Sequence, residues 1–169
     1  TNMKVFSAAA AGEKFHPEFT EDTTDEDFER VMRINLFGPF YTTRAAIPLL
    51  KAAGDAAIVN FSSAAAVTSV AMPPYYPASK AGILGLTRTQ AAELAPFGIR
   101  VNSLAPGAVD TPLFRQADED MIQALISMQP IARAARPEEI ARTVLFLVSD
   151  DAAYYTGHMF SPSGGMVTP

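Results

Sequence analysis

The chain has 169 residues and a formal net charge of −5, and hydrophobic residues make up 49% of it. This composition is that of one ordinary globular domain, residues 1–169, and an acidic chain without a basic run is not expected to bind nucleic acid. No apolar stretch approaches the ~20 residues of a membrane span. The absence of cysteine excludes disulfides and thiolate chemistry and favours a cytoplasmic protein, and two distant histidines give no recognisable metal site.

The first predicted elements are a strand and a long helix. The strand covers residues 3–7 and leads into an alanine-rich turn that ends at Gly12. The helix is indicated by apolar residues that recur near a 3.6-residue period over 28–50. Gly38-Pro39 should bend this helix in its middle, and a bend there would free a carbonyl group near Asn35.

A second strand and a second helix carry the polar residues that matter most. A short apolar run over 57–61 is long enough for a buried strand and too short for a helix, and it leads to Ser63. A proline-containing loop follows, and then a helix over 78–94. Tyr76 and Lys80 are four residues apart, so they should lie on one face near the start of that helix.

The remaining elements continue the alternation of strands and helices. A strand over 99–105 ends in the turn Pro106-Gly107, and the segment 113–135 mixes acidic and apolar residues as amphipathic helical turns do. Pro137 begins a helix, and a last strand covers 158–161. This order predicts an α/β fold with a doubly wound parallel sheet, in which ligands bind at the carboxyl ends of the strands.

Ser63, Tyr76 and Lys80 suit proton transfer to or from the oxygen of a carbonyl or alcohol group. A tyrosine ordinarily titrates near ~10, so it is a poor base at neutral pH. A nearby cation favours the phenolate, and Lys80 would supply that cation and lower the pKa of Tyr76. Ser63 would hydrogen-bond to the substrate oxygen, while a nicotinamide would give or take the hydride.

Four motifs in order resemble the short-chain dehydrogenase/reductase family over nearly the whole chain. They are NLFG at Asn35–Gly38, IVNFSS ending at Ser63, YPASK at Tyr76–Lys80, and GIRVNSLAPGAVDTP at Gly98–Pro112. The resemblance implies that Tyr76 is the catalytic acid/base and that Lys80 lowers its pKa and holds the cofactor ribose. It also implies that Ser63 positions the substrate oxygen and that Asn35 anchors a proton-relay water.

The same resemblance implies a cofactor, a lid and an assembly. The cofactor would be NAD or NADP, and the substrate a small alcohol or ketone. Residues 110–135 would form a substrate lid, and the two long helices would form the interface of a homodimer or homotetramer. The residues implied to bind the cofactor are Gly12, Tyr76, Lys80, Pro106, Gly107, Val109 and Thr111.

The chain departs from the family pattern at the nucleotide site. No G-x-G-x-x-G or T-G-x-x-x-G-x-G turn occurs among its 169 residues, so the sequence holds no backbone cradle for a pyrophosphate. Both asparagines expected just before Gly12 are alanines. We therefore expect the chain to be the C-terminal part of a longer polypeptide that carries the first strands and the glycine-rich turn.

Two functions are consistent with these motifs. The first is an NAD(P)-dependent oxidoreductase that interconverts a secondary alcohol and a ketone. The alternative is a non-catalytic binding or assembly module that keeps the fold but lacks the nucleotide site. A serine hydrolase is disfavoured, because Ser63 has no flanking glycine of a G-x-S-x-G turn.

Overall fold

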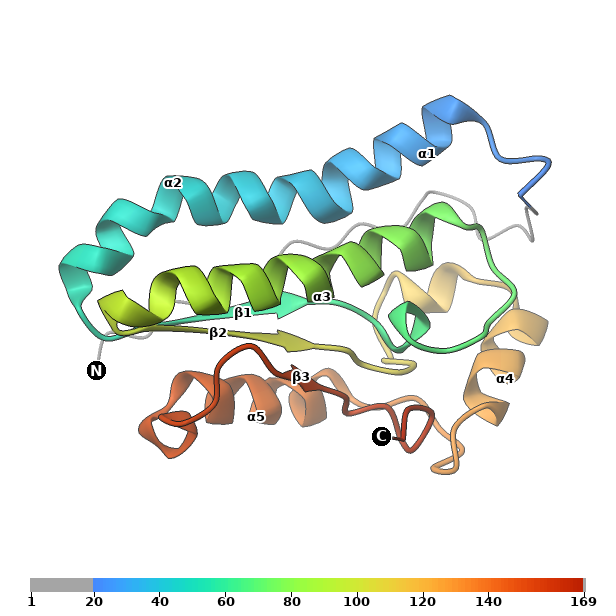
Figure 1. Ribbon diagram of the computed structural model, residues 1–169. Helices are drawn as coiled ribbons and strands as arrows, with labels where there is room; N and C mark the ends of the chain where they lie inside the picture. The colour runs from blue at the N-terminus through green and yellow to red at the C-terminus, as the bar shows by residue number, and fades with distance from the viewer. Residues whose placement is uncertain (1–19, 169) are drawn as a thin grey trace.

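The computed structural model describes residues 20–168, which form a parallel sheet with helices on both faces (Figure 1). The strand predicted over 3–7 and Gly12 lie outside the described residues. The described sheet has three parallel strands in the order β1, β2, β3. They are β1 (Ala56–Phe61), β2 (Ile99–Leu104) and β3 (Met159–Phe160). The predicted doubly wound α/β fold is confirmed.

The helices divide between the two faces of this sheet. One face is covered by a long rod and by a second long helix beside it, and the other face is covered by a helix near the end of the chain (Figure 1). The rod consists of α1 (Asp25–Met32), a π-helical turn η1 (Arg33–Phe37) and α2 (Gly38–Ala53). The remaining helices are α3 (Tyr75–Leu94), α4 (Glu119–Ser127) and α5 (Pro137–Val148).

The two cores follow from the alternation of side chains along β1. Ile58 packs with Leu50 of α2 and Leu94 of α3, whereas Val59, the next residue, packs with Leu147 of α5. Successive side chains of a strand point to opposite faces, so a continuous apolar strand serves both cores. All five of these residues are fully buried.

The irregularity in the first helix lies slightly earlier than the sequence predicts. Gly38 and Pro39 continue as α2, and the chain instead takes a π-helical turn over 33–37, closed by a bond from Gly38 N–H to Arg33 O. Pro39 has no N–H to donate to Asn35 O, so a regular α-helical bond is impossible there. The extra residue in the turn accommodates that lost bond.

The helix α3 begins at Tyr75, three residues before the predicted start. Pro74 precedes its first turn and Pro77 lies within that turn, where backbone N–H groups have no partner inside the helix. Both prolines are therefore compatible with a helix start. Gly82 of α3 allows close packing of the rod, because a Cβ atom there would meet Leu36 Cδ2 at 2.8 Å.

Two polar residues of β2 fix the strand to the segment between α5 and β3. The Arg100 guanidinium donates to three backbone carbonyls, those of Leu147, Ser149 and Ala152. Asn102 donates to Tyr155 O and accepts from His158 N–H. These bonds satisfy carbonyls at the end of α5 and hold β3 beside β2. No helix in the described part of the chain is long and apolar enough to cross a membrane.

Candidate active site

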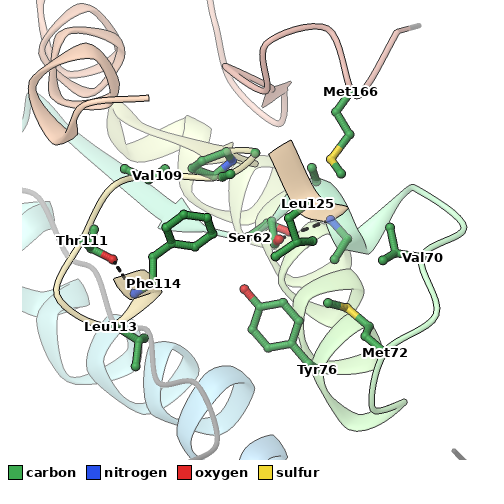
Figure 2. A pocket seen from close by; sticks show the side chains of 16 residues that line it. Ser62, Val70, Met72, Tyr76, Val109, Thr111, Leu113, Phe114, Leu125 and Met166 are labelled. Carbon is green, nitrogen blue, oxygen red and sulfur yellow. Dashed lines mark hydrogen bonds between the residues drawn. The ribbon is translucent and has the colours of Figure 1, made fainter. Parts of the chain in front are cut away.

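A cavity of about 280 Å³ lies at the carboxyl ends of β1 and β2 (Figure 2). Ser63 reaches it because it follows the last residues of β1, and Tyr76 reaches it from the first turn of α3. In Figure 2 the Tyr76 hydroxyl points toward the centre of the cavity. The thirteen-residue spacing in the sequence thus corresponds to two groups that meet across a loop, and the predicted pair is brought together.

Two opposing influences act on the pKa of the Tyr76 phenol. Burial raises the pKa of Tyr76 above its ordinary value, and the neighbouring Ser63 hydroxyl lowers it, with burial the larger effect. Removal of a phenol from water disfavours the phenolate. The sequence assigns the decisive influence to the charge of Lys80, which would act in the opposite direction, and that role of Lys80 stays a prediction.

Lys80 lies beside Tyr76, and its ammonium group binds a backbone carbonyl of β1. Its Nζ atom is 5.8 Å from the centroid of the Tyr76 ring and donates to Phe61 O at 3.1 Å. The side chain is 1% exposed, and this burial lowers the pKa of Lys80 to about 8. Lys80 is a neighbour of the catalytic phenol, but it is not among the residues that line the cavity.

Ser62 and Ser63 have different roles, as their spacing to Tyr76 predicts. Ser62 is buried and its hydroxyl donates to Lys80 O at 2.8 Å, which attaches the end of β1 to α3. The Ser63 oxygen accepts from Ala65 N–H at 3.2 Å, and its hydroxyl influences the pKa of the Tyr76 phenol. Ser63 is therefore the hydroxyl of the pair that neighbours the phenol.

Asn35 supports the site from behind rather than lining it. The residue is fully buried in η1, and its Nδ2 atom donates to Ser79 Oγ at 3.2 Å. Ser79 in turn donates to Tyr76 O at 2.8 Å. This chain of bonds ties the π-helical turn to the first turn of α3. The sequence did not single out Ser79, although its place between Tyr76 and Lys80 within YPASK was a usable signal.

The turn after β2 fits the nicotinamide end of a dinucleotide. Ala108 N–H donates to Gln129 and Asp110 N–H donates to Ala135, on either side of a parallel bridge between Val109 and Ala135. In such a bridge the N–H of the central residue points away from its partner strand. Val109 also lines the cavity. Its N–H therefore points away from Ala135, and the predicted bond to a carboxamide stays a prediction.

Three other predicted cofactor residues line the cavity. They are Pro106, Gly107 and Thr111. Thr111 Oγ1 accepts from Phe114 N–H at 3.2 Å (Figure 2), which fixes the hydroxyl at the start of a short turn. Gly12 lies outside the described residues. Within residues 20–168 no group of three or more His, Cys, Asp or Glu side chains could hold a metal ion.

Gln129 is a positioning residue that sequence reasoning missed. It is 4% exposed, its Oε1 atom accepts from Ala108 N–H at 2.9 Å, and its Nε2 atom donates to Arg133 O at 3.0 Å. A side chain at Gly107 would collide with Gln129 and with Ser163 O. Gln129 therefore connects the end of the predicted lid to the Pro106-Gly107 turn. No motif marks a glutamine whose importance comes only from folding.

The walls of the cavity away from Ser63 and Tyr76 are apolar. Helix α4 contributes Leu125, and a turn before it contributes Phe114 (Figure 2). The other large apolar side chains of the wall are Val70, Met72, Val109, Leu113 and Met166. The predicted lid segment 110–135 thus supplies part of this wall. Met72 and Val70 come from the loop between β1 and α3, which the sequence predicts only as an irregular segment.

Comparison with protein families matches almost the whole chain. A family model described as enoyl-(acyl carrier protein) reductase covers residues 2–167. The chain is 38% identical over 143 residues to the 3-oxoacyl-[acyl-carrier-protein] reductase FabG of Thermotoga maritima, and the match covers 85% of this chain and 58% of that protein.

Two further relatives are dehydrogenases of six-membered rings by name. Cyclohexanol dehydrogenase of an Acinetobacter strain is 39% identical over 145 residues, or 86% of this chain and 57% of that protein. Cis-4-hydroxycyclohexanecarboxylate dehydrogenase of Sinomonas cyclohexanicum is 41% identical over 138 residues, or 82% of this chain and 55% of that protein.

Solved structures give the same result. A 3-oxoacyl-[acyl-carrier protein] reductase from Brucella melitensis matches with a TM-score of 0.87 and 32% identity over 95% of this chain and 62% of that one. A second structure of such a reductase from that organism, with bound NAD, gives a TM-score of 0.84 at 32% identity and covers 95% and 61%. The chain therefore spans less than two thirds of the length of each of these proteins.

Proposed function

We propose that this chain, which belongs to the short-chain dehydrogenase/reductase family, forms the catalytic part of an NAD(P)-dependent oxidoreductase that interconverts a secondary alcohol and a ketone. The observation that carries the proposal is the Tyr76 phenol, which lines, together with Ser63, a cavity whose other walls are apolar. Such a site can exchange a proton with one substrate oxygen and hold an apolar body beyond it.

The roles of the residues follow from this geometry. In the direction of reduction, the protonated Tyr76 phenol gives its proton to the substrate oxygen while Ser63 hydrogen-bonds to that oxygen. In the direction of oxidation, the phenolate takes the proton back. A bound nicotinamide would exchange a hydride with the carbon that bears this oxygen. Val109 N–H would hold its carboxamide, with Lys80 beneath Tyr76 and the turn Pro106-Gly107 against the ring.

Asn35 supports the proposed chemistry through the first turn of α3. Its bond to Ser79, and the bond from Ser79 to Tyr76 O, fix the backbone from which the phenol projects. A water held near Asn35 would extend the proton path away from Tyr76. We keep Gly12, Lys80 and Thr111 as proposed cofactor contacts, and the segment 110–135 as the proposed lid.

The test is to follow the hydride itself. The protein that carries this chain, at its natural length, is supplied with a ketone such as cyclohexanone and with nicotinamide cofactor, NAD- or NADP-type, that is deuterated at the reactive carbon. The proposal expects deuterium at the carbinol carbon of the product, in amounts that depend on Tyr76. If the protein neither binds the cofactor nor transfers the label to any ketone tried, the alternative of a non-catalytic assembly module takes its place.

We also propose that the rod of α1, η1 and α2 lies in an interface with a second copy of the protein, in a homodimer or homotetramer. Large apolar side chains remain exposed along it, including Phe37, Phe40, Tyr41 and, at 69%, Leu49. Exposed apolar groups of this extent mark interaction surfaces. Light scattering should find a dimer or tetramer, and Phe40→Glu should weaken it; a monomeric parent protein would contradict this part of the proposal.

A further inference from the structure

The cavity differs from the sites of enzymes that bind anionic substrates, because it offers no positive charge. Among the described residues that line it, none is charged, and the polar side chains are those of Ser62, Ser63, Tyr76 and Thr111. Ser62 donates its hydroxyl to Lys80 O, and Thr111 Oγ1 accepts from Phe114 N–H. The polar groups that face a substrate are therefore Ser63 and Tyr76, which lie together at one end.

A carboxylate or phosphate in this cavity would leave water without gaining a partner. Burial of an unpaired charge is strongly unfavourable, and the wall of Met72, Phe114 and Leu125 cannot compensate for the loss of hydration. Lys80 is the nearest buried cation, but its Nζ atom donates to Phe61 O and lies beneath Tyr76 instead of in the wall. The apolar end therefore suits an uncharged body.

The charge of the predicted lid also favours an uncharged substrate. Residues 110–135 carry four acidic and two basic side chains; Arg115 pairs with Asp110, and Arg133 pairs with Glu139 of α5. The three remaining acids, Asp118, Glu119 and Asp120, are exposed at the start of α4, whose Leu125 lines the cavity. This negative charge on α4 opposes the approach of an acidic carrier protein or a nucleotide thioester.

The size of the cavity favours a small substrate. Its volume of about 280 Å³ is at the low end of the ~300–1,000 Å³ typical of ligand pockets. We infer that the substrates of this site are small, uncharged secondary alcohols and their ketones, free in solution, in preference to carboxylates or acyl thioesters. This inference rests on the proposed function and adds to it the charge and size of the substrate.

The experiment compares uncharged substrates with charged competitors. The full-length protein is assayed with cyclohexanol and cis-4-hydroxycyclohexanecarboxylate, which share a ring, and in the reverse direction with cyclohexanone and acetoacetyl-coenzyme A, whose charge lies on the carrier. We expect kcat/KM to be at least about tenfold higher for each uncharged ring compound, because the carboxylate brings an unpaired charge to the cavity and the charged carrier meets the acidic side chains of α4. Equal or higher kcat/KM for either charged competitor would overturn the inference and leave the proposed function intact.

A pair of variants tests whether the missing cation causes the preference. Leu125→Lys places an ammonium group on the wall, and Leu125→Met is the matched apolar control. We expect Leu125→Lys to shift the ratio of kcat/KM at least about tenfold toward the carboxylate, while the control keeps the parent ratio. An unchanged ratio in a folded, active lysine variant would also overturn the inference. If no substrate shows turnover that depends on Tyr76, the proposed function itself fails.

Discussion

Two groups of polar side chains flank the same sheet, and they are used in opposite ways. Arg100 and Asn102 of β2 direct their donors to backbone carbonyls of the segment between α5 and β3. Ser63 and Tyr76, at the carboxyl ends of the strands, lie beside one another and face an open cavity. A group whose polar atoms all have backbone partners stabilises the fold, whereas a pair at a cavity can exchange a partner for a substrate. Variants of Tyr76 and of Arg100 should each affect one group and leave the other unchanged.

Tyr76→Phe should have the largest effect. It removes only the hydroxyl that exchanges the proton, so kcat should fall by about 10²–10⁴-fold, the range that general acid/base catalysis supplies. Cofactor affinity and the unfolding midpoint should stay near those of the parent protein. Steady-state kinetics, a cofactor titration and a denaturant curve separate the three quantities. A kcat close to that of the parent would contradict the role of Tyr76.

Arg100→Ala should affect stability instead. It removes three hydrogen bonds to backbone carbonyls at about 1 kcal/mol each, so the free energy of unfolding should fall by about 2–3 kcal/mol. The kcat of the protein that remains folded should not change. Denaturant unfolding measures the free energy of unfolding. Active-site titration gives the concentration of folded enzyme from which kcat is calculated.

The control for Arg100 is Arg142→Ala, which removes an exposed arginine from α5 in the same part of the molecule. Its effect on stability should stay within about 0.5 kcal/mol, as is usual for exposed positions. If the two alanine variants are equally stable, the bonds of Arg100 do not stabilise this end of the sheet.

Gln129→Leu tests a residue that combines the two kinds of role. Gln129 is buried and bonds to backbone groups as Arg100 does, but it should also affect the active site. Loss of its bond to Ala108 N–H frees the turn that holds Val109, so KM for the cofactor should rise by about tenfold, the equivalent of one hydrogen bond, with little change in kcat. Gln129→Glu keeps an acceptor for Ala108 N–H, so its KM for the cofactor should lie between that of the parent protein and that of Gln129→Leu. Gln123→Leu, on the exposed side of α4, is the control.

A fall in stability of Gln129→Leu without any change in cofactor KM would show that the residue only stabilises the lid. A change in kcat alone would place its influence on the substrate and away from the turn. Either result would contradict its assignment as the residue that positions the Pro106-Gly107 turn.

The comparison also explains which parts of the structure could be read from the sequence. The alternation of elements and the spacings of Ser63, Tyr76 and Lys80 were sufficient for the fold and for the central pair, because periodicity and helix geometry are local properties. Gln129 was missed because its partners, Ala108 and Arg133, come together only after folding.

Two finer features could not be read from the sequence, for related reasons. The π-helical turn at Asn35 depends on how the chain accommodates the missing N–H of Pro39, and the sequence predicts only that some irregularity occurs there. The pKa of Tyr76 depends on the balance between burial and neighbouring groups, and burial has no local signature. Both features are decided by packing around α3, which no motif describes.

A further expected effect concerns the stability that the fold loses by burying Lys80. Burial lowers the pKa of this lysine to about 8, so between about pH 8 and its ordinary value of 10.5 the folded chain binds fewer protons there than the unfolded chain. Stability should therefore rise with pH across this interval, and the cost of burying the charge is fully present below it. At neutral pH, Lys80→Met should stabilise the fold by about 2 kcal/mol while turnover is lost.

This gain should shrink as the pH is raised from 8 toward 10.5, because the parent lysine then loses its charge. Denaturant unfolding at several pH values measures this gain. The control is Lys51→Met, at an exposed lysine whose Nζ atom is 3.4 Å from the centroid of the Phe97 ring; it should lower stability by no more than about 1 kcal/mol, with no dependence on pH between 7 and 8. A Lys80→Met variant less stable than the parent at neutral pH would mean that the bond to Phe61 O outweighs the burial of the charge. Lys80 would then belong with Arg100 as a residue that stabilises the fold, whereas a gain would make it a charge kept at the site against the stability of the fold.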